Sequence, residues 1–232
     1  MTKKKQQKTG AESKISEFPE PKTVELSTED YPLLHAKGLK PIILTRLTIV
    51  IFDNEFLIHY NKSDIAKKYD ILSIVPKSAQ CLIALHKSSF RFDILGLRPD
   101  LIFDVKWSRK LYNECIEKFV HFELQYSPAI VDREDRRRII SLAQTFQSVG
   151  KSRKIIVTSG AKLPIELRAP GDVSNLAFIF GLNENQGKEA IKKNCLDVYR
   201  TAMGRKIGVY RVRVERVDQG GDSDSDEAME SD

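Results

Sequence analysis

Apolar runs and segments with helical periodicity alternate along the middle of this chain. Residues 42–52 are apolar or β-branched at almost every position, which is typical of a strand covered on both faces. Arg46 is the exception, and because a buried charge is costly we expect it to be paired or to face a polar interior. Similar runs predict strands at 69–75, 92–97, 122–126 and 154–158, with less regular ones at 101–106 and 208–214.

The helix with the clearest pattern follows the strand at 122–126, after a turn predicted at Ser127-Pro128. Its apolar positions have the three- and four-residue spacing of one helix face: Ile139, Leu142, Ala143, Phe146 and Val149. Gly150 stands where a left-handed residue would end this helix. Other helices are predicted at 63–68, at 79–87, from the N-cap Ser108 to Lys118, at 173–180 before Gly181, and at 183–193 with Asn194 as its stop.

Strands that alternate with helices at this spacing imply a parallel sheet, either open or closed as a (β/α) barrel. In both arrangements functional residues collect just beyond the carboxyl ends of the strands. We therefore expect a polar, partly cationic rim at one edge of the sheet. The residues at those positions are Asp53, Lys77, Ser127 and Ser159-Gly160, with Arg168 shortly after them.

By composition the chain divides into three parts. Residues 1–38 predict a basic, mostly disordered arm, residues 39–215 a single α/β domain, and residues 216–232 an acidic disordered tail. The formal net charge is +6 although seven acidic residues lie in the stretch that begins at Asp218, so the domain itself is strongly basic. Such a body suits nucleic acid and, less often, an acidic protein or a membrane surface.

Four arginines crowd the first turns of the helix described above, where the helix dipole favours anions. Neighbouring acidic residues compensate them only in part. An anionic partner and a solvated face of mixed charge both explain such a cluster, and the pattern alone leaves the two interpretations open. The arginines are Arg133, Arg136, Arg137 and Arg138.

No arrangement in the sequence is typical of a catalytic or metal site. The histidines, His35, His59, His86 and His121, stand singly, without the spacing of zinc motifs. No nucleophile elbow or phosphate-binding glycine loop is present. Nothing in the spacing of Glu123 and Glu166 indicates an acid–base pair, and surface carboxylates are the simpler interpretation. We predict no catalytic residue, no bound metal or cofactor, and no membrane span.

Four segments, in this order, resemble one protein family. They are IILTRLTIVI (42–51), YDILSIVPKS (69–78), FELQYSPAI (122–130) and ELRAPGDVSNLAFIFGLNENQGKEAIKKNC (166–195). Their sequences are similar to the thirty-kilodalton TIM-barrel protein subunit of eukaryotic ribonuclease P and ribonuclease MRP. The resemblance covers roughly residues 40–200, and the FEL-YSPAI segment followed by R-P-DV-NL-FGL is a specific combination.

This resemblance implies a distorted TIM-like barrel related to the polymerase-and-histidinol-phosphatase superfamily, without that superfamily's metal site. It implies a non-catalytic subunit that binds and stabilises the catalytic RNA beside a small ferredoxin-like partner subunit. The holoenzymes remove the 5′ leader of precursor tRNA and, in the MRP form, process precursor rRNA, with Mg²⁺ expected at the RNA. The same resemblance implies a location in the nucleus and nucleolus.

One departure from the family changes the expected fold. The family opens with a strand, a helix and a second strand before the segment that matches residues 42–51, whereas here a lysine-rich arm stands in that place. We therefore predict an incomplete barrel in which the strand at 42–52 lies exposed at one edge, where it would need a covering partner.

Electrostatic scaffolding is the mechanism that we predict, because Arg and Lys side chains bind RNA phosphates by releasing counterions. Two alternatives stay open: a metal-dependent phosphoesterase of the same superfamily, and a protein–protein scaffold that never contacts RNA. The predicted RNA contacts are Arg133, Arg136, Arg137, Arg138, Lys151, Arg153, Lys154 and Arg168, with Arg211 and Arg213 as weaker candidates.

Overall fold

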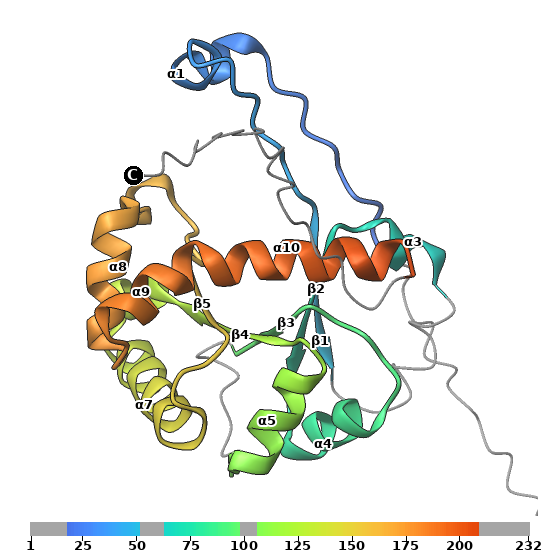
Figure 1. The fold of residues 1–232 in the computed structure, drawn as a ribbon, viewed down its shortest axis with the longest axis vertical. Helices are drawn as coiled ribbons and strands as arrows, with labels where there is room; N and C mark the ends of the chain where they lie inside the picture. Colours follow the sequence, from blue (N-terminus) through green and yellow to red (C-terminus); the bar gives the residue numbers. More distant parts are fainter. Residues whose placement is uncertain (1–17, 52–62, 98–105, 209–232) are drawn as a thin grey trace, which may run out of the picture.

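The computed structural model describes residues 18–51, 63–97 and 106–208 (Figure 1). Strands and helices alternate through most of these ranges, and none of the helices in them is both long and apolar enough to span a bilayer. In chain order the elements are η1 (Thr28–Asp30), α1 (Pro32–His35), β1 (Arg46–Ile51), α3 (Asp64–Lys68), β2 (Ile71–Pro76), α4 (Ala79–Lys87), β3 (Ile94–Gly96), α5 (Arg109–Glu117), β4 (His121–Gln125), α6 (Tyr126–Val131), α7 (Arg133–Gly150), β5 (Ile155–Thr158), η3 (Pro164–Glu166), α8 (Pro170–Ile179), α9 (Glu184–Ile191) and α10 (Lys193–Lys206).

Five strands form one parallel sheet, and their order across the sheet, β1-β2-β3-β4-β5, is their order along the chain. The predicted α/β class with a parallel sheet is therefore confirmed. Within the described ranges the sheet is open, so the predicted barrel is not confirmed. β1 lies at one edge, where the sequence placed an exposed strand, and residues 18–40 contribute no strand to the sheet.

The two faces of the sheet pack against different helices. Side chains alternate between the faces along each strand, so the neighbours Ile94 and Leu95 enter different apolar clusters. Leu95 joins Phe122 in the main core, to which α4, α5 and α7 contribute. On the other face α10 runs across the sheet (Figure 1), and its Val198 packs with Ile94 and Ile156.

Gly150 allows the C-terminal end of α7 to approach an aromatic stack. The rings of Tyr112 and Phe122 are stacked with their centroids 4.3 Å apart. A Cβ atom on Gly150 would lie 2.0 Å from the Tyr112 ring. Gly150 is itself helical, and the left-handed residue after α7 is Lys151, with φ 52°. The predicted left-handed cap at Gly150 is therefore wrong by one residue.

Two other predicted helix boundaries are wrong. α6 begins at Tyr126, directly after β4, in place of the turn predicted at Ser127-Pro128. Pro128 lies in the first turn of α6, where a helix does not need its N–H group. Asn194 does not end a helix but is buried at the start of α10, where its Nδ2 donates to the carbonyl oxygen of Ile155 at 2.7 Å. This bond holds α10, which the sequence did not predict, against β5.

Residues 18–43 contain an arm that reaches away from the sheet (Figure 1). Its first residues lie on the body, where the Tyr69 hydroxyl donates to the Pro19 carbonyl at 2.8 Å and Lys68 pairs with Glu20 at 2.9 Å. α1 lies far from the strands, and its Leu33 is exposed. The predicted strands at 101–106 and 208–214 fall almost entirely outside the described ranges, as do residues 1–17 of the predicted arm and the whole acidic tail.

Candidate nucleic-acid interface

An ion pair between the half-buried Arg46 and the buried Glu123 links β1 to β4. The Arg46 guanidinium donates to both carboxylate oxygens of Glu123, at 2.5 and 2.7 Å, and Glu123 is 1% exposed. Ser73 accepts a further bond from Arg46, and Thr158 donates to Glu123, both at 2.9 Å. Gly96 of the intervening β3 leaves room, because a Cβ there would lie 3.1 Å from the Ser73 hydroxyl. The expected pairing of Arg46 is confirmed, and Glu123 is a buried counter-ion, so its interpretation as a surface carboxylate is wrong.

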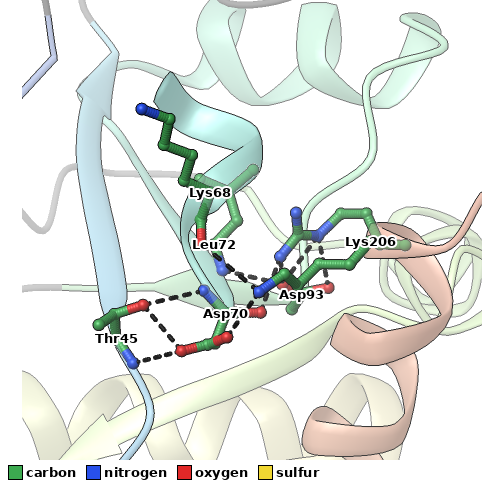
Figure 2. A network of polar contacts seen from close by, with 7 residues as sticks. Thr45, Lys68, Asp70, Leu72, Asp93 and Lys206 are labelled. Carbon is green, nitrogen blue, oxygen red and sulfur yellow. Dashed lines mark hydrogen bonds and ion pairs between the residues drawn. The ribbon is translucent and has the colours of Figure 1, made fainter. Parts of the chain in front are cut away.

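A second network ties the end of α10 to the amino ends of β1, β2 and β3 (Figure 2). Arg205 pairs with the buried Asp93 at 2.9 Å, and Lys206 pairs with Asp70 at 2.7 Å. Asp70 also accepts bonds from the main-chain N–H and the hydroxyl of Thr45, each at 2.8 Å. Burial raises the pKa of Asp93 although the Arg205 bonds oppose this change. The network fastens α10 across the sheet.

The arginines near the start of α7 are exposed, and several pair with neighbouring acids. Arg137 pairs with Glu134 at 2.9 Å and Arg138 with Asp135 at 3.4 Å, each within one turn of the helix. Exposed pairs of this kind contribute little free energy, so an anionic partner could displace the two carboxylates at little cost. Arg133 is exposed at the first position of the helix.

Arg136 and Arg168 bond instead to main-chain carbonyls. Arg136 donates to the carbonyl oxygens of Ala129 and Ile130, at 2.6 and 3.0 Å, where α6 ends and its carbonyls lack helical partners. The Arg168 guanidinium donates to the carbonyl of Ile165 at 2.7 Å, and its main-chain N–H donates to the Tyr126 hydroxyl at 3.1 Å. These bonds go to neutral groups. We call the following set the N-terminal patch: Arg133, Arg136, Arg137, Arg138 and Arg168.

Lys151, Arg153 and Lys154 lie at the other end of α7. This helix has 18 residues and is therefore about 27 Å long. The cations that the sequence placed in one RNA-binding set thus fall into two groups. Arg153 donates to the Asn113 side-chain oxygen at 2.5 Å, and the half-buried Lys154 pairs with Asp197 at 2.8 Å.

A hollow of about 310 Å³ beside this end of α7 is lined by Arg153, Lys154 and Lys193, together with acidic and amide side chains. Gln186 of α9 donates to the Lys151 carbonyl at 2.9 Å and holds α9 against the loop after α7. Lys193 is exposed at the first position of α10, and sequence reasoning missed it because α10 was not predicted. We call the following set the C-terminal patch: Lys151, Arg153, Lys154 and Lys193.

His121 lies buried near the C-terminal patch. Burial and the Lys154 cation lower its pKa to about 4, although the Asp197 carboxylate acts in the opposite direction. Among the described residues, no group of three His, Cys, Asp or Glu side chains could hold a metal ion. Arg211 and Arg213, the weaker candidates for RNA contact, lie outside the described ranges.

These features define an α/β domain with paired internal charges and two cationic patches on its surface. The chain belongs to the family of ribonuclease P subunit p30, whose model matches residues 3–206. The family resemblance of the sequence segments is therefore confirmed. The family model also covers residues 18–40, which contribute no strand to the sheet.

Curated relatives carry the same description. The chain is 35% identical to the mouse ribonuclease P protein subunit p30 over 179 residues, which are 75% of this chain and 65% of that protein. It is 29% identical to a probable ribonuclease P protein subunit 3 of Schizosaccharomyces pombe, over 62% of this chain and 61% of that one. The chain thus spans less than two thirds of the length of these relatives.

A solved structure shares the fold. It is a chain of the cryo-EM structure of archaeal ribonuclease P with mature tRNA, which superposes with a TM-score of 0.57 at 17% identity. The superposition covers 84% of this chain and 87% of that chain. The likeness extends to the arrangement of helices and strands.

Proposed function

We propose that this chain is a non-catalytic protein subunit of ribonuclease P, which removes the 5′ leader of precursor tRNA. In this role the chain binds the RNA of the holoenzyme and stabilises its folded form. Membership in the p30 family supports the proposal, and so does the occurrence of the shared fold in an archaeal ribonuclease P structure with tRNA.

The observation that carries the proposal is the contrast between interior and surface charge. In an α/β enzyme the substrate binds just beyond the carboxyl ends of the strands, whereas Arg46 begins β1 and Glu123 lies inside β4. Here Arg46 and Glu123 close on each other and use the Ser73 and Thr158 hydroxyls as well. The cations that remain accessible lie on the outer surface, which favours binding of a large anionic partner over chemistry in a pocket.

Within this proposal the C-terminal patch contacts RNA phosphates. Lys151 and Arg153 are exposed, and neither forms an ion pair among the contacts of the described residues. Lys193 is paired with Glu189 on the surface at 2.8 Å, and such a pair opens at little cost. Lys154 contributes less, because its pair with Asp197 is half-buried. Each phosphate contact would release counterions and make the affinity depend on salt.

The proposal includes a wider setting that follows from the family. The chain would also serve ribonuclease MRP in processing precursor rRNA, as the name of the budding yeast relative, ribonuclease P/MRP protein subunit RPP1, suggests. It would work in the nucleus and nucleolus beside a small ferredoxin-like subunit. Mg²⁺ would act at the catalytic RNA and not on this chain.

The test reverses charge in the C-terminal patch. The Lys151→Glu/Arg153→Glu variant should bind a ribonuclease P RNA transcript more weakly. The negative slope of log affinity against log salt should become shallower by about 1 to 2, because up to two phosphate contacts are lost. Filter binding across a salt series measures both quantities. Lys67→Glu/Lys87→Glu is the matched control, because Lys67 and Lys87 are exposed on α3 and α4.

The control variant has the same net charge change and should keep most of the slope. An equal loss of slope in both variants would mean that only overall charge matters and would remove the C-terminal patch from the proposal. A wild-type chain without affinity for the transcript would favour the protein scaffold that never contacts RNA.

A further inference from the structure

Exposed apolar side chains occur at the end of α6, around η3 and on α8, and hydrogen bonds and a shared hollow connect these segments to one another. Ile165 is 79% exposed, Ile179 56% and Phe178 52%. Large apolar side chains that stand together on a surface mark sites of association. The set is Val131, Leu163, Ile165, Leu167, Phe178 and Ile179, and we call it the apolar face.

The pattern of α8 departs from that of an ordinary surface helix. Such a helix buries one apolar stripe and presents polar residues on its outer side. α8 buries Val173 and Ala177, as expected, yet its outer positions near the C-terminal end hold Phe178 and Ile179. The helix is thus apolar on two sides, although only one side is covered within the described residues.

A hollow of about 180 Å³ lies between α6 and α8 at the apolar face. Tyr126, Ile130, Leu176 and Phe180 line it, and Arg136 stands among them. A cavity of about 150 Å³ with similar lining holds a benzene molecule. The hollow therefore has room for one aromatic or branched apolar side chain of a partner.

Hydrogen bonds that involve side chains fix α6 relative to the η3 segment and to α7. The Ser127 hydroxyl of α6 donates to Glu166 of η3, and the main-chain N–H of Arg168 donates to the Tyr126 hydroxyl of α6. Arg136 joins α7 to the end of α6. A surface held in this way loses little conformational entropy when a partner binds.

We propose that the apolar face is the docking site for another protein, which inserts an apolar side chain into the hollow between α6 and α8. This inference rests on the proposed function, because the partner would be a protein subunit of the same holoenzyme. Among the described residues, the guanidinium groups of Arg136 and Arg168 bond only to neutral carbonyls and to no carboxylate. The partner therefore carries carboxylates around its apolar side chain, opposite these two arginines.

The chemistry of the face favours protein over RNA. Bases bind by stacking on aromatic rings, whereas most side chains of the apolar face are aliphatic and Phe178 supplies its one exposed ring. Aliphatic surface gains free energy when it is buried against other apolar groups. RNA phosphates could pair with Arg136 and Arg168 at the edge of the face, but they would leave its aliphatic surface exposed to water.

The test compares two exposed isoleucines on helices. Ile179→Asp places a charge at the hollow on α8, and Ile83→Asp places the same charge on α4, where Ile83 is 47% exposed. Each full-length tagged chain is expressed in its own cells, the holoenzyme is purified at high salt, and the ribonuclease P RNA and each protein subunit are quantified. Ile179→Asp should reduce one stoichiometric protein subunit at least tenfold, and Ile83→Asp should reduce none.

The RNA affinity of each isolated chain and its thermal unfolding midpoint are measured in parallel. Ile179→Asp should leave RNA-transcript affinity within about twofold of the unsubstituted chain, since the RNA-binding charges are unchanged. An unchanged set of subunits would overturn the docking site, and so would a loss of RNA affinity equal to that of the Lys151/Arg153 variant. A dimer in sedimentation that disappears with Ile179→Asp would overturn it too, because the occupant would be a second copy of the chain.

Failure of the proposed function has a different signature. If the unsubstituted chain co-purifies with no ribonuclease P RNA, the proposed function is wrong. The docking site is then judged by whether a stoichiometric protein partner of the unsubstituted chain is lost with Ile179→Asp and kept with Ile83→Asp. Loss of that partner in only the first variant supports the site, and retention in both overturns it.

Discussion

The two ends of α7 carry the same sign of charge in different surroundings. At the N-terminal end, Arg136 and Arg168 bond to main-chain carbonyls and lie next to an apolar hollow. At the C-terminal end, Arg153 and Lys193 line a larger hollow with charged and amide groups. About 27 Å of helix separates the two ends.

This difference teaches that the neighbours of a cation, more than its charge, indicate its partner. A phosphate needs a positive charge in a wet, polar setting. An arginine beside exposed aliphatic side chains instead suits a protein interface, where arginine and apolar residues are enriched together. The same helix can therefore present one end to RNA and the other to protein, and the following variants act on one end at a time.

Gly150→Ala should have the largest effect, and it acts at the C-terminal end. The new Cβ would lie 2.0 Å from the Tyr112 ring, and the Tyr112 hydroxyl donates to the Arg153 carbonyl at 2.6 Å. Displacing the ring therefore strains the loop that carries the C-terminal patch. We expect a loss of about 3 kcal/mol in unfolding free energy, measured by urea denaturation, together with weaker RNA binding and retained binding of the protein subunit.

Gly171→Ala is the matched control for this substitution. Gly171 is in the first turn of α8, and no atom lies within 4 Å of the Cβ that alanine would add. Alanine also has the higher helix propensity, so stability should stay the same or rise by up to about 1 kcal/mol. If Gly150→Ala proved equally harmless, the close approach to Tyr112 would not constrain this end of α7.

The alternation of strands and helices could be predicted from the sequence because each element has its own apolar period. Ala79–Lys87 was predicted with the bounds that the structure gives α4. α10 could not be predicted, because it packs across the sheet by scattered positions such as Asn194 and Val198 and is fastened by ion pairs with distant residues. The predicted cap at Gly150 was wrong for a similar reason, since this glycine makes room for the ring of Tyr112, which is distant in sequence.

The candidate site was predictable only as a set of residue types. The arginine cluster and the Lys151–Lys154 stretch are visible in the sequence, but their separation into two patches requires the length and direction of α7. Lys193 joins the C-terminal patch only through the folding of α9 and α10. The apolar character of residues 173–180 was visible too, yet it predicted only a helix, and exposure in the structure is what distinguishes its covered side from Phe178 and Ile179.

A pH titration should probe the C-terminal end of α7 alone, because the titrating group His121 lies near Lys154 at that end. The folded pKa of His121 is about 4, whereas an unfolded histidine has a pKa of about 6.5. As pH falls below 6.5 the unfolded chain takes up the proton first, so stability is complete above that pH and is lost as pH approaches 4. The expected loss is about 2 kcal/mol between pH 6.5 and 5, measured by urea denaturation.

His121→Leu is the control for this titration, since leucine fills similar space and does not titrate. Asp93, whose pKa burial raises, changes stability in the opposite direction as pH falls. It does so in both proteins, and the difference between them therefore reports on His121 together with the Asp197 carboxylate, whose pKa the histidine helps to lower. An identical pH dependence in the two proteins would contradict the assignment to His121.

The smallest effects are expected at the N-terminal end, from Arg136→Met and Arg137→Met. Arg136→Met should cost about 1 kcal/mol of unfolding free energy, because two carbonyls at the end of α6 lose a donor. Arg137→Met removes an exposed pair with Glu134 and should cost less than about 0.5 kcal/mol. Each variant removes one charge, yet neither should change the salt slope of RNA binding. If the negative salt slope became shallower by about 0.9 in both variants, RNA phosphates would lie at this end of α7. The assignment of the two ends to protein and RNA would then be wrong.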